Sequence, residues 1–157
     1  MKAEASAATI LSPVDGVVLA LGDVPDPVFS AQMVGSGVAI RPATSAGRIE
    51  VRSPVAGKIL KLHPHAFVVF TDGKAGVLVH IGIDTVKMRG EGFTLVATEG
   101  DRVQAGDVVL DYDPAAIAAA GYSDVIPVVV MDTKPDTVTT EAVGTTVTAG
   151  EALFELP

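Results

Sequence analysis

The chain has 157 residues, of which 48% are hydrophobic, no cysteine, and a formal net charge of −8. This length fits one domain with its own core, and the missing cysteines exclude a disulfide scaffold, a zinc ribbon and a cysteine nucleophile. The acidic balance argues against a nucleic-acid partner, because binding a polyanion requires a basic face. These properties indicate a folded protein whose partners carry neutral or basic surfaces.

The mean hydropathy of +0.46 raises the question of a membrane segment. No window of about 18 uninterrupted apolar residues is present. Glu4 and Ser6 also interrupt the stretch where a secretory signal needs an apolar core. We therefore expect cytoplasmic residence, a flexible N-terminus over residues 1–10 and a single domain over residues 11–157.

Short apolar runs follow one another along the chain, separated by Gly, Pro and Asp, and Val, Ile and Thr are abundant. β-Branched side chains pack well on a pleated surface and are stiff in helices. The pattern is typical of an all-β fold, an antiparallel sandwich or barrel of short strands. In chain order the predicted strands are 17–21, 37–41, 48–52, 58–62, 66–71, 77–83, 93–97, 108–112, 125–131 and 151–156.

One segment between these strands carries a helix signal. Asp113 is suited to the N-cap, Pro114 to the first helical position, and Gly121 to the position after the last turn. The sequence therefore predicts a short helix between Asp113 and Gly121, on a β scaffold with one or two short peripheral helices.

Two motifs recur in the sequence at nearly equal offsets. Ser-Pro-Val-x-Gly occupies 12–16 and 53–57, and Gly-x-x-Val-x-Ala-Gly with an acidic residue occupies 100–107 and 144–151. The first motif starts a strand after a turn, and the glycines of the second suit a tight reversal. The joint repetition predicts an internally duplicated β unit. We interpret both motifs as architecture, because neither carries a nucleophile or a set of metal ligands.

The three histidines are His63, His65 and His80. Residues 65–83 are typical of two strands joined at Asp72-Gly73, a strong hairpin signal. With a two-residue turn, His65 lies directly opposite His80, and residues opposite each other across a ladder point to the same face. A four-residue loop leaves the two histidines diagonal on one face, whereas a loop of odd length separates them.

Period-two alternation adds apolar residues to the face that carries the two histidines. The pair can be interpreted as ordinary histidines with satisfied hydrogen bonds. Alternatively, one imidazole is a nucleophile near pH 7 and the other donates hydrogen bonds to the charge that the first acquires. A phosphoryl group brings nearly two negative charges, for which a neighbouring imidazole is a suitable donor. The apolar residues expected on this face are Phe67, Val69, Leu78 and Gly82.

A longer pattern follows His80. The segments 80–85 and 86–93 resemble the phosphorylation signature of the glucose-type enzyme IIA of the bacterial phosphoenolpyruvate:sugar phosphotransferase system, the group of glucose, N-acetylglucosamine and β-glucoside components. The resemblance runs from about Leu11 to Glu155 and implies a single enzyme IIA domain that carries phosphoryl groups during sugar uptake. Supporting matches, in the family's order, are segments 23–29, 34–40, 65–67 and 99–106.

The resemblance implies roles for the residues that match the family. His80 accepts the phosphoryl group from the phosphocarrier HPr on Nε2, as a tele-phosphohistidine, and passes it to a IIB domain that serves the membrane IIC transporter. His65 bonds the phosphoryl oxygens, and the Gly82 carbonyl orients His80. Asp26 and Asp84 match acidic positions that meet a basic residue of HPr.

The resemblance also implies an apolar docking face, for which burial in the core is the competing interpretation. It implies no cofactor and no metal, because a phosphoryl relay depends on geometry and charge stabilisation. Zinc held by His65 and His80 would be adventitious. The residues of the expected docking face are Val28, Phe29, Met33, Val34, Phe67 and Leu78.

The sequence departs from the family close to His65. Family members commonly carry a hydroxyl residue two places before the first histidine, where this chain has His63 followed by Pro64. We interpret His63 as a surface residue rather than a third participant in the site.

Two other functions fit parts of the sequence. The pairs His63 with His65 and His80 with Asp84 supply the ligand types of the lysostaphin-like zinc peptidases, in reverse order. On a straight strand, however, His80 and Asp84 lie too far apart to share a metal. The glycine-rich repeats also resemble biotinyl and lipoyl carrier domains, in which Lys74 would be modified. The predicted function is the phosphoryl carrier, and the alternative is the zinc peptidase.

Overall fold

The computed structural model describes residues 9–43, 47–72 and 75–157. Within these ranges the regular secondary structure is mostly strand, as the β-branched composition predicts. The strands are β1 (Thr9–Leu11), β2 (Gly16–Ala20), β3 (Gly35–Pro42), β4 (Ile49–Arg52), β5 (Gly57–His63), β6 (Ala66–Phe70), β7 (Gly76–His80), β8 (Phe93–Leu95), β9 (Arg102–Val103), β10 (Val108–Tyr112), β11 (Ile126–Met131), β12 (Thr146–Val147) and β13 (Ala152–Glu155). Two short α-helices are α2 (Pro27–Ser30) and α3 (Pro114–Ala120), and two 3₁₀ helices are η1 (Leu21–Asp23) and η2 (Thr85–Met88).

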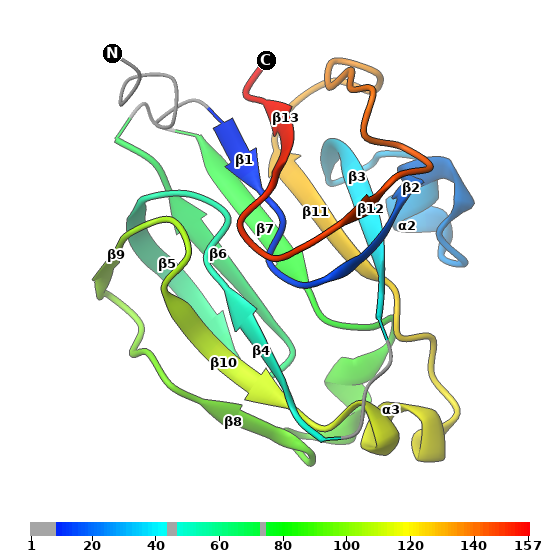
Figure 1. Ribbon diagram of the computed structural model, residues 1–157, viewed down its shortest axis with the longest axis vertical. Coiled ribbons are helices and arrows are strands. Elements are labelled where there is room, and N and C mark those ends of the chain that lie inside the picture. Colours follow the sequence, from blue (N-terminus) through cyan, green and yellow to red (C-terminus); the bar gives the residue numbers. More distant parts are fainter. Residues whose placement is uncertain (1–8, 44–46, 73–74) are drawn as a thin grey trace.

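The strands of the described residues pair antiparallel and form three sheets around one core (Figure 1). The largest has the order β12-β2-β3-β11-β7-β6-β5-β9 and curls into a half-barrel, and the others are β4-β10-β8 and β1-β13. One cluster of buried side chains joins all three sheets, with Ile10 from β1, Leu110 from β10 and Val79 from β7 among its members. The predicted antiparallel all-β fold is confirmed.

The short strands β1, β9 and β12 are absent from the sequence-based prediction, because two or three residues give no periodic signal. The expectation of a flexible segment over residues 1–10 is wrong for Thr9 and Ile10. Both residues pair with β13, and Ile10 is fully buried in the main core. Residues 1–8 of that segment lie outside the described residues.

The predicted internal duplication is confirmed by hydrogen bonds that recur in both copies of the repeat. Each Ser-Pro-Val-x-Gly turn exchanges two main-chain hydrogen bonds with one copy of the glycine-rich motif, 12–16 with 144–151 and 53–57 with 100–107. In both turns the serine hydroxyl donates to the valine carbonyl two residues later. The two copies of the repeat are therefore built in the same way at these turns. The exchanged bonds run from Ser12 to Glu151 (2.7 Å), Gly150 to Ser12 (2.9 Å), Ser53 to Asp107 (2.8 Å) and Gly106 to Ser53 (2.9 Å).

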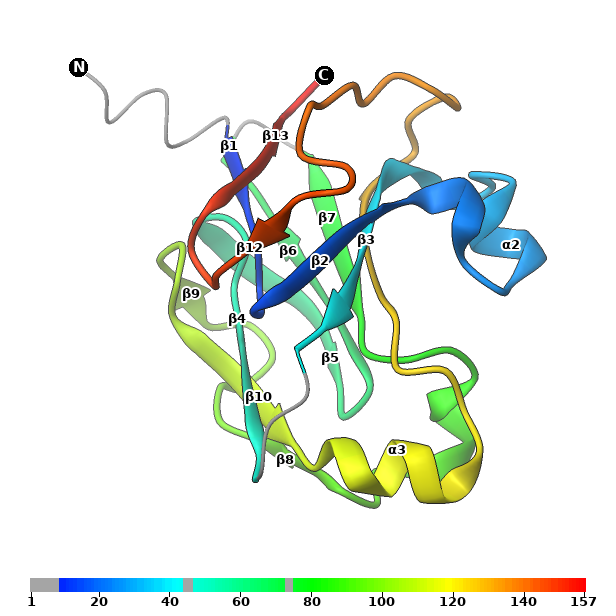
Figure 2. The ribbon, with the colours of Figure 1, turned by 45° about the vertical axis from the view of Figure 1, so that its right-hand side comes forward.

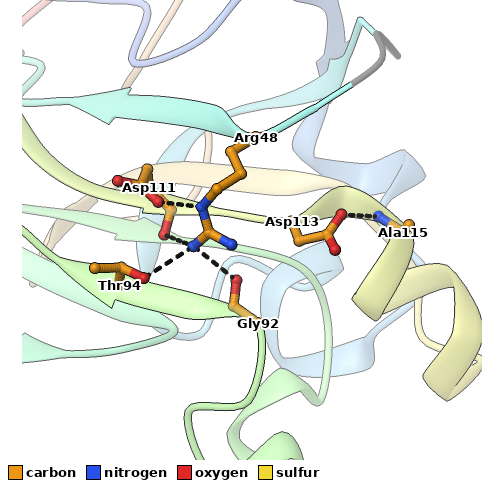
Figure 3. Close-up of polar contacts among 6 residues, drawn as sticks. All are labelled: Arg48, Gly92, Thr94, Asp111, Asp113 and Ala115. Atoms are coloured by element: carbon orange, nitrogen blue, oxygen red, sulfur yellow. Dashed lines mark hydrogen bonds and ion pairs between the residues drawn. The ribbon is translucent and has the colours of Figure 1, made fainter.

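The helix predicted between Asp113 and Gly121 is α3, and its ends are capped as expected. The Asp113 carboxylate accepts a hydrogen bond from the Ala115 N–H at 3.0 Å (Figure 3), and Gly121 adopts a left-handed φ of 83°. Just before β4, the Arg48 guanidinium donates to the Thr94 hydroxyl at 3.0 Å and to the Asp111 carboxylate (Figure 3). These contacts link the residue before β4 to β10 and β8, whose main chains already pair in the small sheet.

A second, smaller apolar cluster covers the face of the large sheet that is turned away from the main core. Helix α2 lies at this face beside β2 and β3 (Figure 2). Phe29 from α2 packs there with Ala39 from β3 and Val129 from β11, and Leu78 from β7 packs against the same cluster. The C-terminal end of β7 therefore lies at a surface formed by the large sheet and α2.

Candidate functional site

His80 is the last residue of β7, and its ring is held by its own chain. The Nδ1 atom lies 2.6 Å from the carbonyl oxygen of Gly82. Because a carbonyl oxygen can only accept, Nδ1 carries the proton, and Nε2 of the neutral ring keeps its lone pair. The expected contact between His80 and Gly82 is therefore present, and it fixes the tautomer in which Nε2 is nucleophilic.

A tight loop after β7 places the Gly82 carbonyl. Gly82 and Asp84 have φ values of 78° and 64°, so the strand ends at His80 and not at residue 83 as predicted. The hydroxyl of the buried Thr85 donates to the Ile81 carbonyl at 2.5 Å. The N–H of Ile83 donates to the Ser123 carbonyl at 3.0 Å. Sequence reasoning missed this support, because no pattern links residue 123 to the loop.

The register of β6 and β7 differs from the predicted one by one residue. Ala66, not His65, lies opposite His80, and the N–H of Ile81 donates to the His65 carbonyl at 2.8 Å. The predicted two-residue turn at Asp72-Gly73 is therefore wrong, because the five residues 71–75 connect the strands and make the loop odd in length. Gly73 and Lys74 themselves lie outside the described residues.

His65 nevertheless lies beside His80, because His65 does not belong to a strand. Pro64 and His65 form the two-residue turn between β5 and β6, where alternation along a strand does not set the side-chain direction. The ring centroids of His65 and His80 are 5.3 Å apart, with an interplanar angle of 72°. The other neighbours are Phe29, in an edge-to-face contact with His80 at a centroid distance of 5.3 Å, and His63, stacked on His65 at 5.7 Å.

The altered register also changes which residues share a face with His80. Phe67 and Val69 belong to the main core together with Val79, whereas Leu78 packs on the opposite face, which His80 shares. Placing Phe67 and Val69 on the histidine face is therefore wrong. The physical reason is that a slip of one residue turns every side chain of a strand to the other face.

Apolar side chains lie on and beside α2, whose Phe29 contacts His80. Val28 and Met33 are 43% and 73% exposed, whereas Phe29 is buried against His80. Val34 and Leu78 are partly buried against the second cluster. Phe67 is only 1% exposed, so the expectation that it forms part of a docking face is wrong.

Asp26 and Asp84 lie close enough to His80 to act on its charge. Asp26 is the N-cap of α2, where its Oδ2 accepts from the Phe29 N–H at 3.1 Å. Helix α2 is absent from the sequence-based prediction. The pair Asp26-Pro27 could have predicted it, because it repeats the N-cap and first-position pattern that marks α3.

Both histidines of the pair resist protonation. Burial lowers the pKa of His80 below the ordinary value of 6.5, against the Gly82 hydrogen bond and the charges of Asp26 and Asp84, which raise it. Burial lowers the pKa of His65 to about 4, and repulsion from His80 and His63 adds to the effect. Near pH 7 His80 is therefore a neutral ring with a free lone pair on Nε2, and His65 is a neutral ring with one N–H donor.

Comparisons with known proteins decide which family these residues belong to. The family described as the phosphoenolpyruvate-dependent sugar phosphotransferase system, EIIA 1, matches residues 8–135. The chain belongs to this family. The predicted identity is confirmed, and this EIIA chain is a phosphoryl carrier of the sugar phosphotransferase system.

Relatives of this EIIA chain match it over most of their length. It is 39% identical over 145 residues to the PTS system glucose-specific EIIA component of Oceanobacillus iheyensis, covering 91% of this chain and 86% of the relative. The component of the same name from Halalkalibacterium halodurans is 40% identical over 144 residues, covering 90% and 81%. The solved structure of glucose permease IIA from Mycoplasma capricolum matches with a TM-score of 0.84 and 32% identity, covering 93% of each chain.

The family match gives no support to a zinc peptidase. Within residues 9–43, 47–72 and 75–157, no three His, Asp or Glu side chains converge on a place where they could hold a metal. Lys74, the modified residue in the carrier-domain interpretation, lies outside the described residues. No helix in the described part of the EIIA chain is long and apolar enough to cross a membrane.

The lowered pKa values predict how the histidines of this EIIA chain titrate. We expect the His65 ring to titrate near pH 4 and His80 below 6.5 when their ring protons are followed by NMR. Because the unfolded chain binds these protons more readily, the free energy of unfolding should fall as pH drops from about 6.5 toward 4. In His80→Gln the pKa of His65 should rise, since one source of repulsion is gone. A His65 midpoint at 6.5 in the unaltered protein would contradict this prediction.

Gly82 is predicted to be more sensitive to substitution than other glycines with a similar backbone. A Cβ at Gly82 would lie 2.5 Å from Thr85 Cγ2 and 2.9 Å from the Ser123 carbonyl oxygen, whereas one at Gly121, with φ of 83°, meets nothing within 4 Å. We expect Gly121→Ala to lower the free energy of unfolding by about 1 kcal/mol and Gly82→Ala by about 2–4 kcal/mol. Urea denaturation of both variants measures the difference. Equal losses would show that the contacts of Gly82 do not matter.

Proposed function

We propose that this EIIA chain carries the phosphoryl group on Nε2 of His80, between HPr and a IIB domain. The observation that carries the proposal is the 2.6 Å contact between His80 Nδ1 and the Gly82 carbonyl. It leaves Nε2 as the nucleophile of a ring that is neutral near pH 7.

Phosphoryl acceptance then forms one bond and breaks another. The Nε2 lone pair bonds to phosphorus while the bond from phosphorus to the leaving atom of HPr breaks, and its electron pair stays with that atom. The His80 ring gains positive charge as the new bond forms. The Nδ1 proton stays in its bond to the Gly82 carbonyl, and Asp26 and Asp84 favour the charged ring.

His65 is the proposed donor to the phosphoryl oxygens. Its ring lies edge to face with His80, at a centroid distance of 5.3 Å, and near pH 7 it is neutral and carries one N–H. A hydrogen bond to a charged oxygen is about twice as strong as one between neutral groups. The donor is therefore already in place where negative charge is transferred.

The docking surface we propose is the apolar area around the histidines, formed by the exposed Val28 and Met33 with the partly buried Val34 and Leu78. Asp26 and Asp84 add negative charge beside it, which suits a basic residue of HPr. Phe29 acts from beneath this surface, by packing against His80.

Onward transfer reverses the first step. The bond between Nε2 and phosphorus breaks, its electron pair returns to the nitrogen, and the phosphoryl group passes to a cysteine thiolate of the IIB domain. That nucleophile has to come from the partner, because the chain contains no cysteine. The IIB domain then serves a membrane IIC transporter, and the EIIA chain works in the cytoplasm.

The test is to incubate the protein with phosphoenolpyruvate, enzyme I and HPr, and to map the phosphate by mass spectrometry. We expect one acid-labile phosphate on the peptide that contains His80, and none when HPr is left out. Phosphate on His65, or an unlabelled protein in the complete mixture, would overturn the proposal.

A further inference from the structure

His63, Ala66 and His80 form one row across three neighbouring strands. His63 lies opposite Ala66 in the pairing of β5 with β6, and Ala66 lies opposite His80 in the pairing of β6 with β7. Residues opposite each other across a ladder point to the same face. Since adjacent strands are about 4.8 Å apart, the backbones at His63 and His80 are about 10 Å apart, with only the methyl group of Ala66 between their side chains.

The ring of His65 occupies the space above Ala66. It is stacked on His63, with centroids 5.7 Å apart and planes inclined by 23°, and it meets His80 edge to face at 5.3 Å. His63 itself is exposed, so the main core does not account for its position. The three imidazoles form a continuous series in which His65 lies between the other two.

His65 has little else to fix its ring. It belongs to a two-residue turn, and among the described residues no side-chain hydrogen bond involves either of its ring nitrogens. Its ring meets His80 in an edge-to-face contact and is stacked on His63. Because stacked rings restrict rotation and tilt, the His63 side chain is placed to set the orientation of His65.

We propose that His63 is a positioning residue, which stacks on His65 and holds its ring where the N–H faces a phosphoryl group on His80. This inference rests on the proposed function. It adds a residue that acts through His65 and does not itself touch the phosphoryl group. At the position where relatives commonly carry a hydroxyl residue, this chain thus has His63, whose ring acts by stacking on His65.

Three substitutions separate the flat face of His63 from its polar nitrogens. His63→Ala removes both, His63→Phe keeps an aromatic ring without an N–H, and His63→Gln keeps a polar donor without a ring. We expect sugar-phosphorylation turnover, measured with purified IIB and IIC partners, to fall roughly 2- to 12-fold in His63→Ala and His63→Gln. His63→Phe should restore most of it. Unchanged turnover in His63→Ala would overturn the inference, as would rescue by Gln and not by Phe.

A second readout does not depend on phosphoryl transfer. In the unphosphorylated protein, NMR chemical shifts of the His65 ring protons report on the ring stacked against them. We expect these shifts to move in His63→Ala and His63→Gln and to stay near the original values in His63→Phe. Identical His65 shifts in all four proteins would overturn the stacking role. If the unaltered protein takes up no phosphate on His80, the proposed function fails, and the shifts still decide whether His63 positions His65.

Discussion

Replacing His80 with glutamine should remove phosphate uptake altogether, with label falling by at least about 10³-fold to the background of the assay. The side-chain amide has no lone pair comparable to that of Nε2 in a neutral imidazole, so no bond to phosphorus can form. Glutamine is the sharpest substitution because its amide N–H can still donate to the Gly82 carbonyl that holds Nδ1 in the parent protein. The loop after β7 should therefore keep its shape.

The His80→Gln experiment needs a control for folding and one for the assay. The variant should retain a cooperative unfolding transition, since His80 is the last residue of β7 and its ring contacts are those with Phe29 and His65. Lys58→Gln is a matched surface change, because Lys58 is exposed on β5 at the end away from His63. It should take up phosphate like the unaltered protein. A folded His80→Gln protein that still takes up phosphate would exclude His80 as the acceptor.

The hairpin of β6 and β7 shows what alternation in the sequence can and cannot define. The sequence predicts both strands and the turn between them. It does not define their register, because β6 is buried at every position from Ala66 to Val69. In a strand that is apolar on both faces, alternation does not show which residues share a face, so only the length of the turn can set the register. The loop 71–75 has an odd number of residues whereas the predicted turn has an even number, and that difference places Phe67 and Val69 on the other face.

The meeting of His65 and His80 has a different origin from the one that the sequence suggests. The sequence predicts a cross-strand pair, whereas the structure brings the rings together through the turn Pro64-His65. The contact of His80 with Gly82 is local, two residues along the chain, and the resemblance to the family was enough to predict it. The hydrogen bond from Ile83 to the Ser123 carbonyl and the stacking of His63 on His65 depend on tertiary packing, so the sequence alone gives no signal for either.

Replacing His65 with glutamine should separate acceptance of the phosphoryl group from its onward transfer. The acceptor nitrogen of His80 is untouched, so with excess phosphoenolpyruvate the protein should still reach nearly full phosphate occupancy at the end point. Turnover of sugar phosphorylation should fall about 10²-fold, the usual cost of removing one preorganised donor to developing charge. The measurements are end-point labelling and the steady-state rate with IIB and IIC partners.

The series His65→Gln and His65→Ala tests whether the loss of a hydrogen-bond donor causes the expected fall in turnover. Glutamine keeps an N–H donor on a flexible chain, whereas alanine keeps none, so turnover should rank the parent above Gln and Gln above Ala. The phosphorylated form should also accumulate in both variants during turnover, because its discharge to IIB becomes the slow step. If His65→Ala passes phosphate on at the parent rate, His65 is only a packing neighbour of His80. Its lowered pKa would then reflect burial between His63 and His80 without a part in catalysis.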